Sequence, residues 1–135
     1  LGAEKQKAWL SDQRFARRFG FETVDTTPDG YELLALSLDG TKPRFAPSVT
    51  QCIDEKGLVV YYDMQCPFIP ARVATLQKYC AEQGIPARFV EVDSLAAAKS
   101  LPCVFNNWAV FCGGVFQTVN QLDPAALERI LKRKK

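Results

Sequence analysis

The feature that most constrains the fold is an apolar run, a helical pattern and a second apolar run in close succession. Residues 58–63 are apolar, β-branched and aromatic up to a final aspartate, which is typical of a central strand. Apolar side chains then recur at helical spacing over residues 70–83, and Gly84 marks the stop. A second strand is predicted at 87–93. This succession predicts a βαβ unit, whose two strands run parallel with a right-handed crossover between them.

The residues that follow complete an α/β pattern. A short Ala-rich helix is predicted at 94–100 and a long strand at 103–111. Two glycines at 113–114 predict a hairpin turn, and 115–118 is its return strand. Asp123 caps a last helix with a proline at its first position. The predicted fold class is therefore α/β, with the βαβ-α-ββα order of a thioredoxin-like domain.

The N-terminal part follows a different pattern. Ser11 can cap a short helix that runs through Phe19, and strand-like runs follow at 21–27 and 31–38 with a Pro-Asp-Gly turn between them. A helix and one hairpin bury too little apolar area to form a stable domain alone. We therefore expect this segment to pack on another domain or on a second copy of the chain.

Charge and hydropathy exclude several classes of partner. The chain has 17 Lys and Arg against 15 Asp and Glu, a formal net charge of +2, which argues against nucleic acid as the main partner. No apolar run approaches ~18 residues, so neither a membrane span nor a membrane partner is expected. No signal peptide is visible. Because the first residue is Leu rather than Met, we expect a C-terminal fragment or a truncated relative of a longer protein.

Histidine is absent, which removes Ser-His-Asp and Cys-His nucleophilic systems and every His-containing metal site. The five cysteines are odd in number and form no C-x-x-C pair, so we expect reduced thiols, no metal and a cytoplasmic location. Cys80 and Cys112 lie on apolar faces and are expected to be buried and inert.

Cys66 is the strongest candidate for a functional residue, because it lies between the first strand of the βαβ unit and its helix. Free N–H groups and the helix dipole favour a thiolate at that point, so Cys66 is a candidate nucleophile or thiol-binding residue. The alternative is a retained cysteine without a redox role, since the usual resolving position is Ile69. Cys103, after Pro102, is a candidate redox partner, or else only a small strand residue.

Further binding candidates adjoin these two cysteines. Asparagine is depleted in strands, so an Asn pair in the predicted 103–111 strand indicates a bulge at a binding groove or simply a solvent face. Aromatic side chains in strands usually pack in the core, which is the alternative for the tryptophan beside the pair. The candidates are Pro67, Phe68, Pro102, Asn106, Asn107 and Trp108.

The second part of the chain resembles the YoaP-like domain, a thioredoxin-like domain that follows a GNAT-superfamily acetyltransferase domain in bacterial proteins. The resemblance rests on residues 59–68, the Gly-Ile-Pro step at 84–86, residues 101–111 and the closing helix. It covers most of the chain after residue 50.

The first 40 residues look like the tail of a GNAT domain. Residues 15–21 resemble the GNAT pattern F-Y-x-x-x-G-F, and the two strands after them resemble the last β-arm of that fold. The resemblance thus implies a GNAT remnant at 1–42, a linker at 43–49 and a YoaP-like domain at 50–135.

Two departures limit what the resemblance implies. The GNAT tyrosine that often acts as general acid falls at Ala16, and no Gly-rich pyrophosphate loop occurs in the chain. A full-length parent is implied to be an acetyl-CoA-dependent N-acetyltransferase, whereas this chain is catalytically incomplete and carries no cofactor of its own. We expect an accessory binding or structural domain, with the missing GNAT domain or a second copy in a homodimer as partner. A monothiol redox domain using Cys66 and a protein-interaction module are the alternatives.

Overall fold

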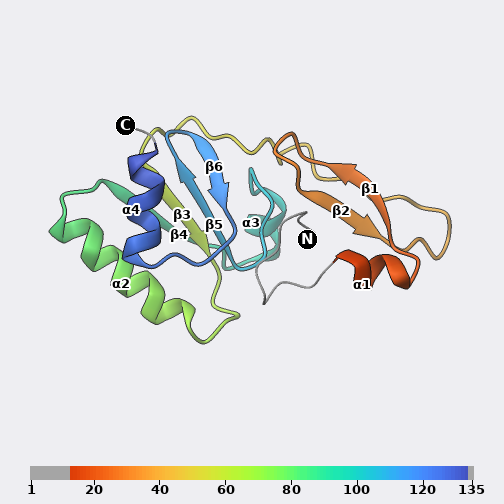
Figure 1. Cartoon of the computed structure of the whole chain (residues 1–135), viewed down its shortest axis with the longest axis horizontal. Coiled ribbons are helices and arrows are strands. Elements are labelled where there is room, and N and C mark those ends of the chain that lie inside the picture. Colours follow the sequence, from red (N-terminus) through yellow and green to blue (C-terminus); the bar gives the residue numbers. More distant parts are fainter. Residues whose placement is uncertain (1–12, 134–135) are drawn as a thin grey trace. The chain divides into compact units, whose positions relative to one another are not determined.

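The computed structural model describes residues 13–133. The chain divides into two compact units, residues 1–49 and residues 50–135, which are drawn in Figure 1 and described in turn. The predicted helix start at Ser11 lies outside the described residues.

The first unit is a short helix followed by an antiparallel hairpin. Helix α1 spans Gln13–Arg18, β1 spans Glu22–Thr26 and β2 spans Glu32–Ala35. The two strands pair with each other, with an irregularity in β1. Gly30 in the turn has φ +91°, a left-handed conformation that glycine adopts without steric cost. The predicted helix, turn and hairpin are confirmed.

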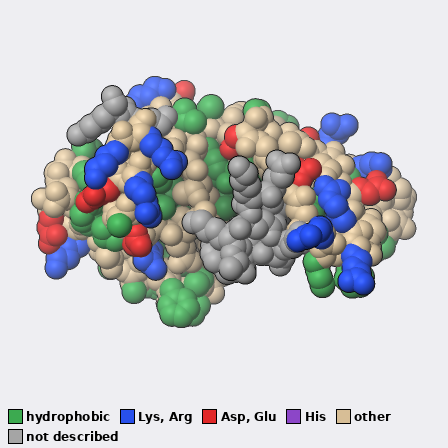
Figure 2. Space-filling model, viewed as in Figure 1, with side chains coloured by type: hydrophobic (Ala, Val, Ile, Leu, Met, Phe, Trp, Pro, Cys, Tyr) green, Lys and Arg blue, Asp and Glu red, His purple; other side chains and the backbone are tan. Residues whose placement is uncertain are grey.

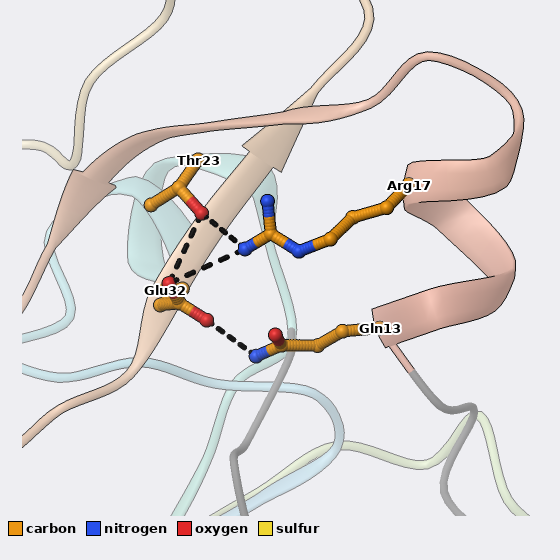
Figure 3. A network of polar contacts seen from close by, with 4 residues as sticks. All are labelled: Gln13, Arg17, Thr23 and Glu32. Atoms are coloured by element: carbon orange, nitrogen blue, oxygen red, sulfur yellow. Dashed lines mark hydrogen bonds and ion pairs between the residues drawn. The ribbon is translucent and has the colours of Figure 1, made fainter.

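A polar network joins α1 to the hairpin, and Figure 3 shows its four side chains turned toward one another. Arg17 Nη2 donates to Thr23 Oγ1 at 2.6 Å and lies 3.4 Å from Glu32 Oε1. Thr23 Oγ1 donates to the same carboxylate oxygen at 3.0 Å, and Gln13 donates to the other one. These bonds tie α1 to the hairpin, and no residue of α1 is buried.

The second unit contains a four-stranded mixed sheet in the order β4-β3-β5-β6. Its strands are β3 (Leu58–Tyr62), β4 (Ala87–Glu91), β5 (Trp108–Cys112) and β6 (Val115–Thr118). β3 and β4 are parallel, whereas β5 is antiparallel to both β3 and β6. The predicted parallel βαβ pair and the α/β class are confirmed.

Three helices accompany this sheet. α2 spans Ile69–Glu82, α3 spans Leu95–Lys99 and α4 spans Pro124–Lys132. The Ser94 and Asp123 side chains accept the backbone N–H three residues on, which caps α3 and α4. In Figure 1, α2 and α4 lie side by side along the sheet, and Tyr79 of α2 donates a 2.6 Å hydrogen bond to Glu128 of α4.

The main core lies between the sheet and these two helices. Alternate residues of β3 and β5 enter it, as strand geometry requires, together with the apolar stripes of α2 and α4. Its buried members are Leu58, Val60, Ile69, Val73, Leu76, Cys80, Trp108, Val110, Cys112, Leu122, Leu127 and Ile130. The predictions that Cys80 and Cys112 are buried are therefore confirmed.

The predicted long strand at 103–111 is wrong in its first half. The strand β5 starts only at Trp108, and residues 103–107 form a loop. Asn106 Oδ1 accepts the backbone N–H groups of Asn107 and Trp108 at 2.6 and 3.2 Å. Such local hydrogen bonds compete with the backbone hydrogen bonds between neighbouring strands. The Asn pair therefore precedes the strand instead of interrupting it.

The surface carries both charges and several apolar side chains. On the face shown in Figure 2, both Lys or Arg and Asp or Glu side chains are scattered over the surface. Phe15, Phe19, Leu36 and Leu38 of the first unit are exposed, as are Met64, Phe68, Leu95 and Val115 of the second. No helix within residues 13–133 combines the length and apolar character that crossing a membrane requires.

Candidate functional site

A pocket of about 660 Å³ lies where the parallel strands β3 and β4 end. Asp63 directly follows β3, Glu91 is the last residue of β4, and Asp93 follows two residues later. The start of α3 and the loop before β5 complete the walls. In α/β proteins, ligands bind preferentially beyond the carboxyl ends of the strands, so this is the expected end of the sheet for a site.

Asp63 is the buried polar residue of this pocket, with 7% of its surface exposed. Its backbone N–H donates to the carbonyl oxygen of Asn107 at 3.2 Å, which ties the end of β3 to the loop before β5. Its Oδ1 accepts the backbone N–H of Gln65 at 3.0 Å. The carboxylate is therefore held in place by the turn that leads to α2.

Cys66 lies in that same turn, three residues before α2, where the sequence predicted it. It is partly exposed, and it packs against the core between the sheet and the helices. Gln121 Nε2 donates to Cys66 Sγ at 3.7 Å, and the Cys66 carbonyl accepts the N–H of Ile69 at 3.0 Å. The position of Cys66 is thus as expected, while its reactivity stays a prediction.

Pro67 and Phe68 follow Cys66 and are both exposed. Phe68 is the N-cap residue of α2 but has helical backbone angles and makes no side-chain capping bond. Its ring is 72% exposed, which is unusual for a phenylalanine next to a core helix. Both residues are accessible to a ligand, as a binding role would require.

Cys103 is set in a different environment. It is buried in the loop before β5, and desolvation raises the pKa of its thiol to about 12. A thiol with that pKa stays protonated at neutral pH and is a poor nucleophile. All five cysteines are free, and Cys103 is not part of the core cluster against which Cys66 packs. The predicted pairing of the two thiols stays untested.

The loop around Cys103 is held by one side chain from far away in the sequence. Gln51 Oε1 accepts the N–H of Val104 at 2.9 Å, and the Gln51 N–H donates to the Pro102 carbonyl at 2.8 Å. Gln51 itself is buried and has φ +60°. Within residues 13–133 every peptide bond is trans, including the one before Pro102.

Asn106, Asn107 and Trp108 lie close to the pocket in sequence but differ in exposure. Asn106 is exposed and lines the pocket, and Asn107 is half-buried. Trp108 is fully buried in the core, and its Nε1 has no hydrogen-bond partner among the described residues. The structure thus brings Asn106 together with Asp63, whereas the Trp108 ring serves the core.

The sequence interpretation missed the acidic lining of the pocket. Each predicted strand of the βαβ unit ends on an acidic residue, and the carboxyl ends of parallel strands meet at one edge of a sheet. That pattern was readable in the sequence. The burial of Asp63 could not be read from the sequence, because the loop before β5 forms part of its surroundings.

Comparison with known proteins gives two matches. The YoaP-like family matches residues 86–129, from just before β4 to within α4. The protein named "Uncharacterized N-acetyltransferase YoaP" of Bacillus subtilis (strain 168) is 28% identical over 134 residues, which are 97% of this chain and 53% of the relative. The chain therefore spans about half the length of that curated relative. No solved structure matches. The family match and this relative both support a YoaP-like classification of the chain.

Proposed function

We propose that the chain is the C-terminal accessory part of a YoaP-like GNAT N-acetyltransferase. The observation that carries the proposal is the alignment of nearly the whole chain with about half of a protein named as an N-acetyltransferase. The sequence supports an accessory role, because it has no Gly-rich pyrophosphate loop and has Ala16 at the position of the GNAT tyrosine. Acetyl-CoA would then bind to residues that this chain does not contain.

The second unit would be a thioredoxin-like binding or structural domain. Its element order, β3-α2-β4-α3-β5-β6-α4, supports this arrangement, as does the parallel pairing of the inner strand β3 with the edge strand β4. The parts of this domain suited to binding are the exposed residues around Cys66 and the pocket beyond β3 and β4. We propose that this end of the sheet is its functional end.

The first unit would be the last segment of the acetyltransferase domain. Helix α1 and the β1–β2 hairpin have the order expected for that segment. Phe15 and Phe19, whose ring centroids are 5.2 Å apart, are 66% and 62% exposed, and Leu38 is 91% exposed. Apolar side chains this exposed support a partner, either the remainder of a GNAT domain or a second copy.

A thiol-handling role for Cys66 is the second candidate function. The contact that favours it is the amide donor Gln121 Nε2, 3.7 Å from the sulfur of a partly exposed cysteine. A monothiol role would need no second cysteine, which agrees with the burial of Cys103.

The accessory role can be tested in the Bacillus subtilis relative. A version shortened to end at the residue aligned with Val49 should bind acetyl-CoA as tightly as the full-length protein, because the accessory domain supplies no acetyl-CoA contact. Calorimetric titration measures the affinity, and a thermal melt verifies that the shortened protein is folded. Loss of acetyl-CoA binding in a folded, shortened protein would contradict the accessory role.

A further inference from the structure

A short segment at the start of the second unit lies along β6, the last strand in the order of the sheet. Cys52 forms an isolated antiparallel bridge with Val115, the first residue of β6. The next residue of the strand, Phe116, donates its N–H to the Gln51 carbonyl oxygen at 3.0 Å. Residues 51–53, called the strap below, therefore partly cover this edge of the sheet.

Gln51 also fastens the strap to the loop before β5. Its N–H donates to the Pro102 carbonyl oxygen at 2.8 Å, and its Oε1 accepts the Val104 N–H at 2.9 Å. Gln51 thus joins β6 and the loop through its backbone and its side chain together. The residue is only 5% exposed, so loss of its amide would leave the Val104 N–H buried without a partner.

The backbone of Gln51 opposes this attachment. Its φ is +60°, and within residues 13–133 it is the one residue other than glycine with a positive φ. A residue with a Cβ atom adopts this left-handed conformation against steric repulsion, and such strain persists only where the surrounding contacts hold it. Opening of the three hydrogen bonds would release the strain, so the strap is biased toward release by its own backbone.

The loop that Gln51 holds forms part of the pocket end of the sheet. Cys103 lies between the two bonded positions and is buried. Asn106 lines the pocket, and the Asn107 carbonyl oxygen accepts the Asp63 N–H at 3.2 Å, where β3 ends. The contacts therefore lead from the strap through the loop to the end of β3.

We propose that the strap is a releasable latch, which Gln51 closes over the loop of residues 102–107. The closed latch shields Cys103 and holds the loop against the end of β3. Release frees the loop, exposes Cys103 and loosens the wall of the pocket, while the core between the sheet and the helices α2 and α4 stays intact. The latch goes beyond the proposed accessory role and does not depend on it; only the description of the pocket end as functional rests on that role.

The wild-type chain alone provides the first test. Cys80 is the matched thiol, because it lies in the main core and is 3% exposed, as is Cys103. Under native conditions an alkylating reagent should label Cys103 faster than Cys80 by about tenfold or more, since opening the latch is easier than unfolding. Low concentrations of urea should accelerate the labelling of Cys103 less than that of Cys80, because the latch exposes less surface. Equal rates with equal urea dependence would overturn the proposal.

A variant assigns the opening to Gln51. Gln51→Met keeps the length of the side chain but removes the amide oxygen that accepts the Val104 N–H, so its Cys103 should be labelled about tenfold faster than in the wild type. Gln77→Met makes the same change at an exposed position of α2 and should leave the rate unchanged.

Hydrogen exchange, followed by NMR, tests whether the latch reaches the end of β3. The Asp63 N–H should exchange faster in Gln51→Met than in the wild type, because the loop that accepts it is released. Unchanged labelling of Cys103 in the folded variant, or faster labelling without faster exchange at Asp63, would contradict the latch. If Gln51→Met does not fold, the comparison of Cys103 with Cys80 in the wild type decides.

Discussion

Ile53 donates its backbone N–H to the carbonyl oxygen of Gly114 at 2.9 Å, which fastens the segment before β3 to the β5–β6 hairpin turn. The approach is so close that a Cβ atom on Gly114 would lie 2.7 Å from the Ile53 carbonyl oxygen. Gly114 also has φ +80°, so both its backbone conformation and its contacts require glycine.

The substitution Gly114→Ala should therefore destabilise the second unit by about 2 to 4 kcal/mol, through left-handed strain and overpacking together. Gly84→Ala is the matched control, because Gly84 has φ +62° but open space around its Cβ position. The control should cost only about 1 kcal/mol. Urea unfolding of both variants measures the difference, and equal losses would show that the contact with Ile53 is unimportant.

Burial of Cys103 predicts a pH dependence of stability. Its pKa is raised to about 12 in the folded protein, whereas the unfolded thiol has its ordinary pKa of 9.0. As the pH rises, the unfolded chain therefore loses this proton before the folded protein does. The stability contributed by the protonated thiol is present below the unfolded pKa, and it falls as the pH rises from the unfolded pKa to the folded pKa.

Between about pH 8 and pH 10, the wild-type protein should lose about 1 kcal/mol more stability than the variant Cys103→Ala. Other titrating groups, including Cys80 with its raised pKa, are common to both proteins and cancel in the comparison. Urea unfolding at the two pH values is the measurement. Parallel losses in the two proteins would mean that Cys103 is not desolvated in solution.

Cys66 should be the most reactive of the five thiols. It adjoins the N-terminus of α2, and the Gln121 amide donates to its sulfur. Alkylation with limiting reagent near neutral pH, followed by peptide mapping, should label it before Cys52, although Cys52 is the more exposed residue. Gln121→Met removes the donor and should slow labelling of Cys66, with Cys52 as internal reference. Labelling of Cys52 or Cys103 with Cys66 spared would contradict this placement of the site.

Local patterns were sufficient to predict most of the second unit. The helix α2, the short Ala-rich helix α3 and the Asp123 cap follow from spacing and residue type within a few positions of each other, and the structure has them as expected. The strand predicted from Cys103 failed because apolar side chains in that loop resemble a strand in sequence. The backbone of that loop is bonded to Gln51, 53 positions before Val104, and a single sequence does not reveal that contact.

The candidate site was predictable only in part. The position of Cys66 follows from the strand and helix on either side of it. The pocket forms where three segments meet at one end of the sheet, and the Asp63 N–H bonds the Asn107 carbonyl in a loop far along the chain, which local patterns do not reveal. Trp108 was a binding candidate because it neighbours two asparagines, but alternation along β5 turns its ring into the core.

The proposed accessory role places the acetyl-CoA site outside this chain. The most direct measurement is calorimetric titration of the whole chain with acetyl-CoA, with the full-length Bacillus subtilis relative titrated in parallel. We expect heat of binding from the relative and none from this chain, because it has no loop to hold the pyrophosphate. Micromolar binding of acetyl-CoA by the chain alone would contradict the claim.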